Sequence, residues 1–186
     1  RYNTVSCFKT QRNNIMIKIH TPFNDEILCK LKPFDKVLIT GYMYIARDQA
    51  HKRMYMEGIP FDAAGQCIYH CGPSEAKNNE VIGSAGPTSS YRMNEYMPYM
   101  FENGIRAFIG KGKVSDAVVE SIKQNRCVYF GAIGGLGAKL SKCIKKQRII
   151  AYESLGTEAL REIYVENFPA VVIINCEGES IYERDG

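Results

Sequence analysis

The stretch IRAFIGKGKVSDAVVESIKQNRCVYF, residues 105–130, places a strand, a loop, a helix and a second strand in direct succession. Residues 105–109 are apolar except for Arg106 and favour a strand, and the glycines of residues 110–112 predict a tight loop after it. Ser115 can cap the following helix, and residues 127–130 predict a buried strand. This order is typical of an α/β protein with parallel strands, whose ligands bind beyond the carboxyl ends of the strands.

The alternation of strands and helices extends over the rest of the chain. We predict further strands at residues 15–19, 35–44, 67–71, 149–152, 163–165 and 171–175, and further helices at 25–31, 48–57, 93–101 and 136–143. Residues 1–14 are polar and predict an ill-ordered lead-in or a strap. We therefore expect a polar lead-in over residues 1–14 and a single α/β domain over residues 15–186.

The composition narrows the classes of function. Of the 186 residues, 45% are hydrophobic and 24% are charged, which is ordinary for a soluble globular protein. The net charge of +4 is mild for a protein that binds nucleic acid. The longest weakly polar run, residues 127–136, is too short to span a bilayer. We expect a cytoplasmic location without nucleic-acid or membrane partners; an organellar location stays open, because the sequence begins at Arg1 rather than at a methionine.

The seven cysteines predict a structural rather than a metal-binding use. They stand at positions 7, 29, 67, 71, 127, 143 and 176 and form no CxxC pair. Their odd number and scattered positions argue against a disulfide framework and for a reducing compartment. We therefore predict no metal site in this chain.

The densest signal for ligand binding is GSAGPTSSYRMN, residues 83–94. Its small residues allow a ligand to approach the backbone closely. Arg92 falls near the first turn of the predicted helix, where the helix dipole favours anions over cations. A bound carboxylate would explain an arginine there, because a guanidinium can hold it with two hydrogen bonds. The alternative is a helix cap followed by a solvated arginine.

Two other loops carry candidate residues. Lys111, between two glycines, can lean over a pocket as a point charge, although on this segment alone a surface turn is the better explanation and the GxxxxGK[ST] spacing is absent. Arg47 precedes a predicted helix for which Asp48 is a plausible cap. His51 lies one turn further on, and by itself indicates a packed or solvated side chain.

A glycine-rich segment, GAIGGLGA at residues 131–138, suggests a dinucleotide site only weakly. The GxGxxG spacing is not reproduced, and no suitably placed acidic residue follows it. Close packing of a strand on a helix, or approach to a partner chain, explains these glycines better.

Four strings carry a resemblance to a known family: T-G-x5-R-D-x-A-H-K-R, V-I-G-S-A-G-P-T-S-x-x-R-M, G-I-R-A-F-I-G-K-G and E-x-F-P-A-V-V. In this order, over residues 37–186, they resemble the β subunit, or C-terminal domain, of class I fumarate hydratases and L(+)-tartrate dehydratases. The resemblance implies a swivelling β/β/α domain. It also implies a [4Fe–4S] cluster that a separate α subunit holds through three cysteines, with none bound by this chain alone.

The resemblance further implies roles for individual residues. Arg47, Arg92 and Lys111 would bind the carboxylates of the substrate, with Asp48 and His51 as supporting residues. Thr88 would be the catalytic residue, next to the carbon that gains or loses a proton. A threonine is a weak base, so this role would need a carboxylate from the α subunit.

The expected activity is the reversible hydration of fumarate to malate, together with the α subunit and within a higher oligomer. An L(+)-tartrate dehydratase is an alternative, because the segment Ser89-Ser90-Tyr91 stands where many members of the family have Thr-Ser-Gly. A non-catalytic stabilising subunit is the alternative from another class.

Overall fold

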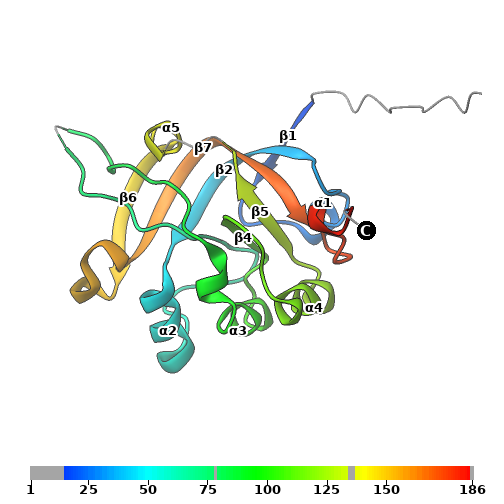
Figure 1. The fold of residues 1–186 in the computed structure, drawn as a ribbon. Coiled ribbons are helices and arrows are strands. Elements are labelled where there is room, and N and C mark those ends of the chain that lie inside the picture. The colour runs from blue at the N-terminus through cyan, green and yellow to red at the C-terminus, as the bar shows by residue number, and fades with distance from the viewer. Residues whose placement is uncertain (1–14, 78, 134–136, 185–186) are drawn as a thin grey trace, which may run out of the picture.

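The computed structural model describes residues 15–77, 79–133 and 137–184 (Figure 1). Within these residues, seven strands form one sheet: β1 (Met16–His20), β2 (Lys36–Ile45), β3 (Cys67–Tyr69), β4 (Ala107–Gly110), β5 (Val128–Ala132), β6 (Ile144–Ala151) and β7 (Leu160–Ile174). The helices are α1 (Asp25–Leu28), α2 (Asp48–Glu57), α3 (Met97–Glu102), α4 (Asp116–Asn125) and α5 (Gly137–Ser141), with 3-10 helices η1 (Ser90–Met93), η2 (Glu153–Glu158) and η3 (Ile181–Arg184). The lead-in predicted at residues 1–14 lies outside the described residues, as does the first residue of the helix predicted at 136–143.

The sheet is mixed and strand-rich, and it closes on itself. Strands β1 to β5 run parallel to their neighbours. Strand β7 runs antiparallel to β2, β5 and β6. Because β7 pairs with both β2 and β5, the strands β2, β3, β4, β5 and β7 form a barrel-like ring, while β1 and β6 pair alongside it. The prediction of a mixed α/β fold is therefore confirmed.

Strand β7 differs from the sequence prediction. Residues 163–165 and 171–175 were predicted as separate strands, but one strand of 15 residues covers 160–174. Asn167 has a φ of 51°, and Pro169 has no N–H to donate, so the local sequence favours a break. Pairing with the long β2 carries the strand through, with Pro169 opposite Leu38 and a register shift at residues 39–41.

Two other elements were also predicted with wrong bounds. Strand β6 begins at Ile144 rather than near residue 149, because its polar start pairs with β7 at the edge of the sheet. The helix predicted at 93–101 is interrupted: η1 ends at Met93, and α3 begins at Met97. Gly104 follows α3 with a φ of 110°, as a residue after a helix C-terminus often does.

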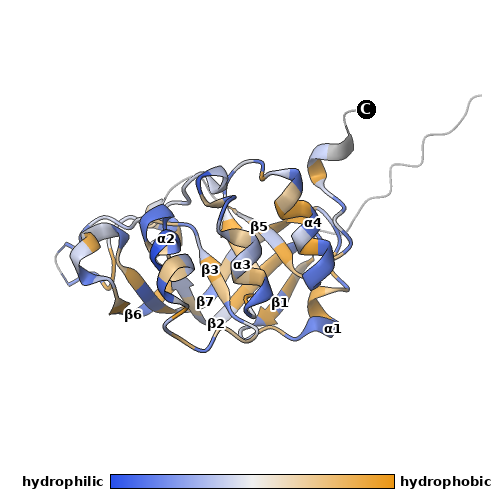
Figure 2. Cartoon of the chain, turned by 90° about the horizontal axis from the view of Figure 1, so that it is seen from below, coloured by the Kyte–Doolittle hydropathy of each residue, from blue (hydrophilic) through white to orange (hydrophobic). Residues whose placement is uncertain are grey.

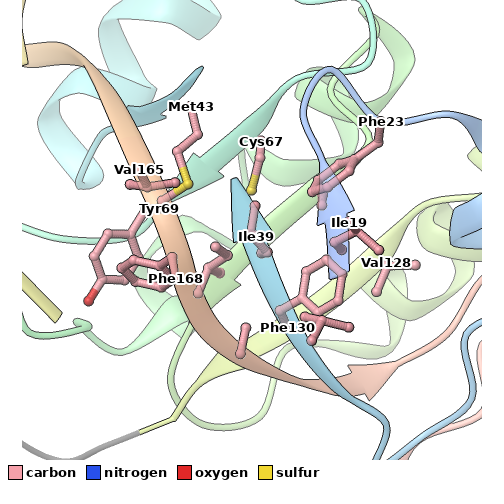
Figure 3. Packing of buried hydrophobic residues seen from close by; sticks show 14 of the residues in the cluster. Ile19, Phe23, Ile39, Met43, Cys67, Tyr69, Val128, Phe130, Val165 and Phe168 are labelled. Atoms are coloured by element: carbon pink, nitrogen blue, oxygen red, sulfur yellow. The ribbon is translucent and has the colours of Figure 1, made fainter. Parts of the chain in front are cut away.

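Both faces of the central parallel strands β3, β4 and β5 are buried, as is usual for such sheets, whereas β1 is largely exposed. Alternate side chains enter a core inside the ring, which includes Ile39, Tyr69, Phe130 and Phe168 (Figure 3). Intervening residues such as Phe108 enter a second core, which also contains residues from α2, α3 and α4. These three helices lie along one side of the sheet (Figure 1), and hydrophilic residues are frequent on α2 (Figure 2). None of the helices in the described part of the chain has the length and apolar character that crossing a bilayer requires.

Replacing Phe168 with alanine is expected to lower the free energy of unfolding by about 3–5 kcal/mol. The Phe168 side chain is fully buried, and its ring centroid lies 5.2 Å from that of Tyr69. Urea denaturation followed by circular dichroism measures the change. Glu166→Ala, an exposed position on the same strand, serves as the control and should change the free energy by no more than about 0.5 kcal/mol. Equal losses in the two variants would contradict the packing.

Candidate functional site

The loops that carry the candidate residues leave the sheet at one end of the ring. Strands β2, β3 and β4 are parallel, so their carboxyl ends share one edge. Arg47 follows β2, residues 70–72 follow β3, and Lys111 follows β4. The topology therefore brings loops from distant parts of the sequence to the same rim.

Residues 87–90 cross this rim and pair with two of the loops. The backbone N–H of Thr88 donates to the carbonyl of His70 at 2.8 Å, and that of Ser90 donates to the carbonyl of Lys111 at 3.0 Å. Isolated bridges on either side of Thr88 extend this pairing to the ends of β3 and β4. Thr88 and Lys111 thus lie on backbone segments that are paired side by side.

A buried group of polar side chains lies beneath the crossing segment. The Ser90 hydroxyl is 2.8 Å from His70 Nδ1 and 3.0 Å from the Tyr129 hydroxyl, and all three residues are fully buried. The Tyr129 hydroxyl is also 3.0 Å from the carbonyl oxygen of Gly112. A Cβ at position 110 would collide with the Ser90 hydroxyl, so Gly110 is required for this close approach. The group connects the loop after β4 to the segment that carries Thr88.

Arg47 is held in place by carboxylates and by a glycine. Its Nη2 lies 3.2 Å from Glu158 and 3.6 Å from Asp48, and its side chain is only 25% exposed. A Cβ on Gly72 would lie 2.6 Å from the Arg47 Cδ, so the arginine stem passes directly over the end of β3. The Arg47 Nε is buried and has no hydrogen-bond partner. This N–H can donate a hydrogen bond to an acceptor that the described residues do not supply.

The cap predicted for α2 is wrong in its residue. Asp48 is the first residue of the helix, and Arg47 occupies the cap position without a side-chain cap bond. Glu158 instead accepts a hydrogen bond from the backbone N–H of Gln49 at 3.3 Å. The Glu158 carboxylate thus pairs with a backbone N–H in the first turn of α2, which has no partner within the helix. Glu158 and Asp48 both lie at the N-terminus of α2, where the helix dipole stabilises negative charge.

His51 is fully buried on α2. Its Nδ1 lies 2.8 Å from the backbone carbonyl of Arg47, which can only accept, so Nδ1 carries the proton. Its ring centroid is 5.1 Å from that of His70. Burial lowers the pKa of His51 to about 4, and burial followed by the charge of His51 lowers the pKa of His70 well below its usual value. Both rings are neutral at pH 7, and the Nε2 atom of each has no partner.

Arg92 is exposed and lies on the 3-10 helix η1. The N-terminus of a longer α-helix, which the sequence analysis expected beside Arg92, is not formed there. The crossing segment leads into a 3-10 helix of four residues, and the dipole argument for Arg92 is therefore wrong. The pKa of Arg92 is raised first by its hydrogen bond to Tyr91 and less by the charges of Asp48 and Glu158. Its guanidinium is thus close enough to sense the carboxylates that pair with Arg47. Lys111 is exposed next to Ser90, and Thr88 is half-buried.

Two parts of the site were missed by the sequence analysis. Glu158 belongs to no recognisable motif, and its contact with Arg47 arises only when η2 packs on α2. His70 and Ser90 had no assigned role, although Ser90 lies within the glycine-rich segment. The contact between Gly110 and the Ser90 hydroxyl indicates that Ser90 belongs to the site. This contact joins residues that are 20 positions apart, so it is visible in the tertiary structure and not in the sequence.

The described residues do not fit an iron–sulfur cluster. No three histidine, cysteine, aspartate or glutamate side chains among them gather as metal ligands. Cys7 lies outside the described residues.

A cavity of about 690 Å³ lies beside the site rather than in it. It is lined by Ser74, Glu75, Lys77 and residues 80–84, and by residues in and between α5 and β6. None of the candidate residues lines it, so the rim residues are better described as an open surface than as an enclosed pocket.

Comparison with known proteins decides the family. Residues 3–185 match the family described as Fumarase C-terminus. The chain belongs to this family. A protein of Methanocaldococcus jannaschii provisionally named L(+)-tartrate dehydratase subunit beta is 36% identical over 83% of this chain and 85% of its own length. A Geobacillus stearothermophilus protein provisionally named class I fumarate hydratase is 35% identical over 94% of this chain. The aerobic class I fumarate hydratase of Escherichia coli is 29% identical over 91%.

The members of this family differ in length. The chain spans about a third of the G. stearothermophilus and E. coli proteins, at 35% and 33% of their lengths. It spans most of the M. jannaschii subunit.

Replacing Gly110 with alanine is expected to lower the free energy of unfolding by about 1–3 kcal/mol, because the added methyl group displaces the Ser90 hydroxyl. Gly86→Ala is the matched control, since the nearest atom to its added Cβ is 3.7 Å away. Thermal or urea unfolding of the two variants provides the comparison. A Gly110 variant as stable as the Gly86 variant would show that Ser90 can move freely.

Acid is expected to destabilise the fold through His51. The unfolded histidine binds a proton below its ordinary pKa of 6.5, whereas the folded one does so only near 4, so stability falls as the pH falls between these values. The loss from His51 alone should reach about 3 kcal/mol. Urea unfolding at a series of pH values measures it.

His51→Asn is expected to reduce the slope of the unfolding free energy against pH, and His70, whose pKa is also lowered by burial, accounts for the slope that is left. Met54→Ala, a buried and non-titrating position on the same helix, should lower stability at every pH and keep the wild-type slope. An unchanged slope in His51→Asn would rule out His51 as its source.

Proposed function

We propose that this chain is the β-type part of an iron–sulfur hydro-lyase that reversibly hydrates fumarate to malate together with an α subunit. The observation that carries the proposal is the pairing of the Thr88 segment with the Lys111 loop on the rim where Arg47 lies. A dicarboxylate needs cationic groups from more than one direction, and we propose that Arg47, Arg92 and Lys111 supply them from three separate segments. The names of the relatives support the same activity.

Arg47 is proposed to bind one substrate carboxylate. Its buried Nε finds no hydrogen-bond partner among the described residues. A buried donor without a partner costs free energy, and a hydrogen bond to a substrate carboxylate would offset that cost. Asp48 and Glu158 restrain Nη2 and so fix the direction of the guanidinium. We propose Asp48 and His51 as supporting residues, because the His51 N–H holds the backbone carbonyl of Arg47.

Arg92 and Lys111 are proposed to bind the other carboxylate and to stabilise the negative charge that develops on it during proton removal. Both are exposed cations on segments adjacent to Thr88. Arg47, Arg92 and Lys111 carry three positive charges, and Asp48 and Glu158 carry two negative ones. The net positive charge of these five side chains favours the binding of a dianion.

Thr88 is proposed to lie next to the carbon that exchanges a proton. Its backbone is fixed by the bond to His70 and by the Ser90 group beneath it. Its hydroxyl is a weak base, so we propose that a carboxylate of the α subunit activates it.

The [4Fe–4S] cluster is proposed to be held by the α subunit. We also propose that residues 15–186 act as one domain that swivels against this partner. Assembly into a higher oligomer and a cytoplasmic location stay predictions.

L(+)-tartrate dehydratase is the second candidate. The M. jannaschii relative, most of whose length this chain covers, carries that name for a separate β subunit. The same cations would bind a dicarboxylate with one further hydroxyl group. Parallel assays of the reconstituted pair on malate and tartrate distinguish the two substrates.

Arg92→Ala is expected to lower kcat/KM of the reconstituted pair by roughly ten- to a hundredfold, as the loss of a charged hydrogen bond to substrate does. Arg53→Ala is the matched control, because this exposed arginine pairs with Glu57 on α2 and is assigned no role in binding. Co-purification measures assembly, and steady-state kinetics measures turnover. Normal assembly with unchanged turnover in Arg92→Ala would favour a non-catalytic stabilising subunit.

A further inference from the structure

A pair of cysteines lies close together away from the rim. Cys29 follows the last residue of α1, and Cys176 lies in the turn after β7, 147 positions later. Their sulfur atoms are 2.8 Å apart, and both cysteines are free thiols. Nothing in the proposed hydration reaction uses them.

The contact is held by the surrounding structure. The backbone of Phe34 donates to Val172 at 3.0 Å, and that of Val172 donates to Asp35 at 2.9 Å. An ion pair of 3.4 Å joins Lys32 to Glu177, next to Cys176. These contacts fasten the segment after α1 to the end of β7, so the two thiols need only a small approach to form a bond of about 2.05 Å.

The two thiols have different environments. Cys29 is partly exposed, so a small disulfide in solution can reach its sulfur. Cys176 is 8% exposed and donates its S–H to the backbone carbonyl of Arg126 at 3.1 Å. Burial is the main cause that raises the pKa of Cys176. Cys29 therefore suits an attacking thiolate, and Cys176 suits a resolving thiol.

We propose that Cys29 and Cys176 form a reversible disulfide when the protein meets an oxidised low-molecular-weight thiol such as glutathione disulfide. The Cys29 thiolate attacks one sulfur of glutathione disulfide, breaks its S–S bond and releases one glutathione thiolate. Cys176 then loses its proton and attacks the Cys29 sulfur, which releases the second glutathione. Two protein thiols are oxidised to one disulfide, and glutathione disulfide is reduced to two thiols.

The cross-link affects stability rather than the rim. Ile174, near the end of β7, pairs with Tyr129 near the start of β5, whereas the candidate site lies beyond the opposite, carboxyl ends of the parallel strands. A disulfide here closes a very long loop, which restricts the unfolded chain. The oxidised protein should therefore melt about 5–10 °C higher than the reduced protein.

The test treats the full chain with glutathione disulfide and maps its peptides by mass spectrometry without reduction. The expected product is a Cys29–Cys176 linked peptide that disappears on treatment with dithiothreitol. Cys176→Ser should stop at a glutathione adduct on Cys29, and Cys29→Ser should form neither product. Melting of each variant in reductant verifies that it folds, and Cys29→Ala and Cys176→Ala replace any serine variant that does not.

Cys143→Ser is the matched control. Cys143 is also partly exposed, but the hydrogen bonds of its sulfur within the described residues go to the backbone carbonyls of Lys139 and Asn167, not to another thiol. This variant should form the cross-link and gain the same thermal stability as the wild type. The proposal is overturned if Cys29 and Cys143 carry equal glutathione adducts without a linked peptide, or if the rise in melting temperature persists in Cys29→Ser. Neither readout depends on hydro-lyase activity.

Discussion

The architecture depends on the antiparallel pairing of β7 with both β2 and β5. Without that pairing, the parallel strands would form an open sheet with β5 as an unpaired edge. With it, five strands close into a ring with one core inside and a second core under α2, α3 and α4. Closure also holds the carboxyl ends of β2, β3 and β4 at a common rim, and this geometry brings the candidate residues together.

The rim combines a rigid base with unsatisfied polar groups. Ser90, His70 and Tyr129 form the base, and their burial leaves little freedom to the segment that carries Thr88. Among the described residues, Arg47 Nε, Asp48 Oδ1 and the Nε2 atoms of both buried histidines find no hydrogen-bond partner. Such atoms are costly in a folded protein and are expected mainly where a ligand or a partner completes the site. An incomplete rim is consistent with a chain that supplies only part of an active centre.

The regular elements were predictable where the hydrophobic period was strong and the boundary residues were clear. Helix α2 was predicted at its observed bounds, and Ser115 caps α4 as expected through its bond to Val118. Strand β7 was not, because Asn167 and Pro169 favour a break that only the pairing with β2 overcomes. Within the site, the motifs indicated Arg47, Thr88, Arg92 and Lys111. Glu158 could not be found in this way, because its partners lie far away in the sequence.

The sequence by itself determined the family, the alternation of strands and helices, and the segments on which the candidate cations stand, because local periodicity and short motifs carry that information. The tertiary structure alone decided which carboxylate holds Arg47, which buried hydroxyl supports the Thr88 segment, and which cysteines meet. Each of these contacts joins residues from separate elements. Their distances follow from the closure of the ring and from the packing of η2 and α1 against it, which no local pattern encodes.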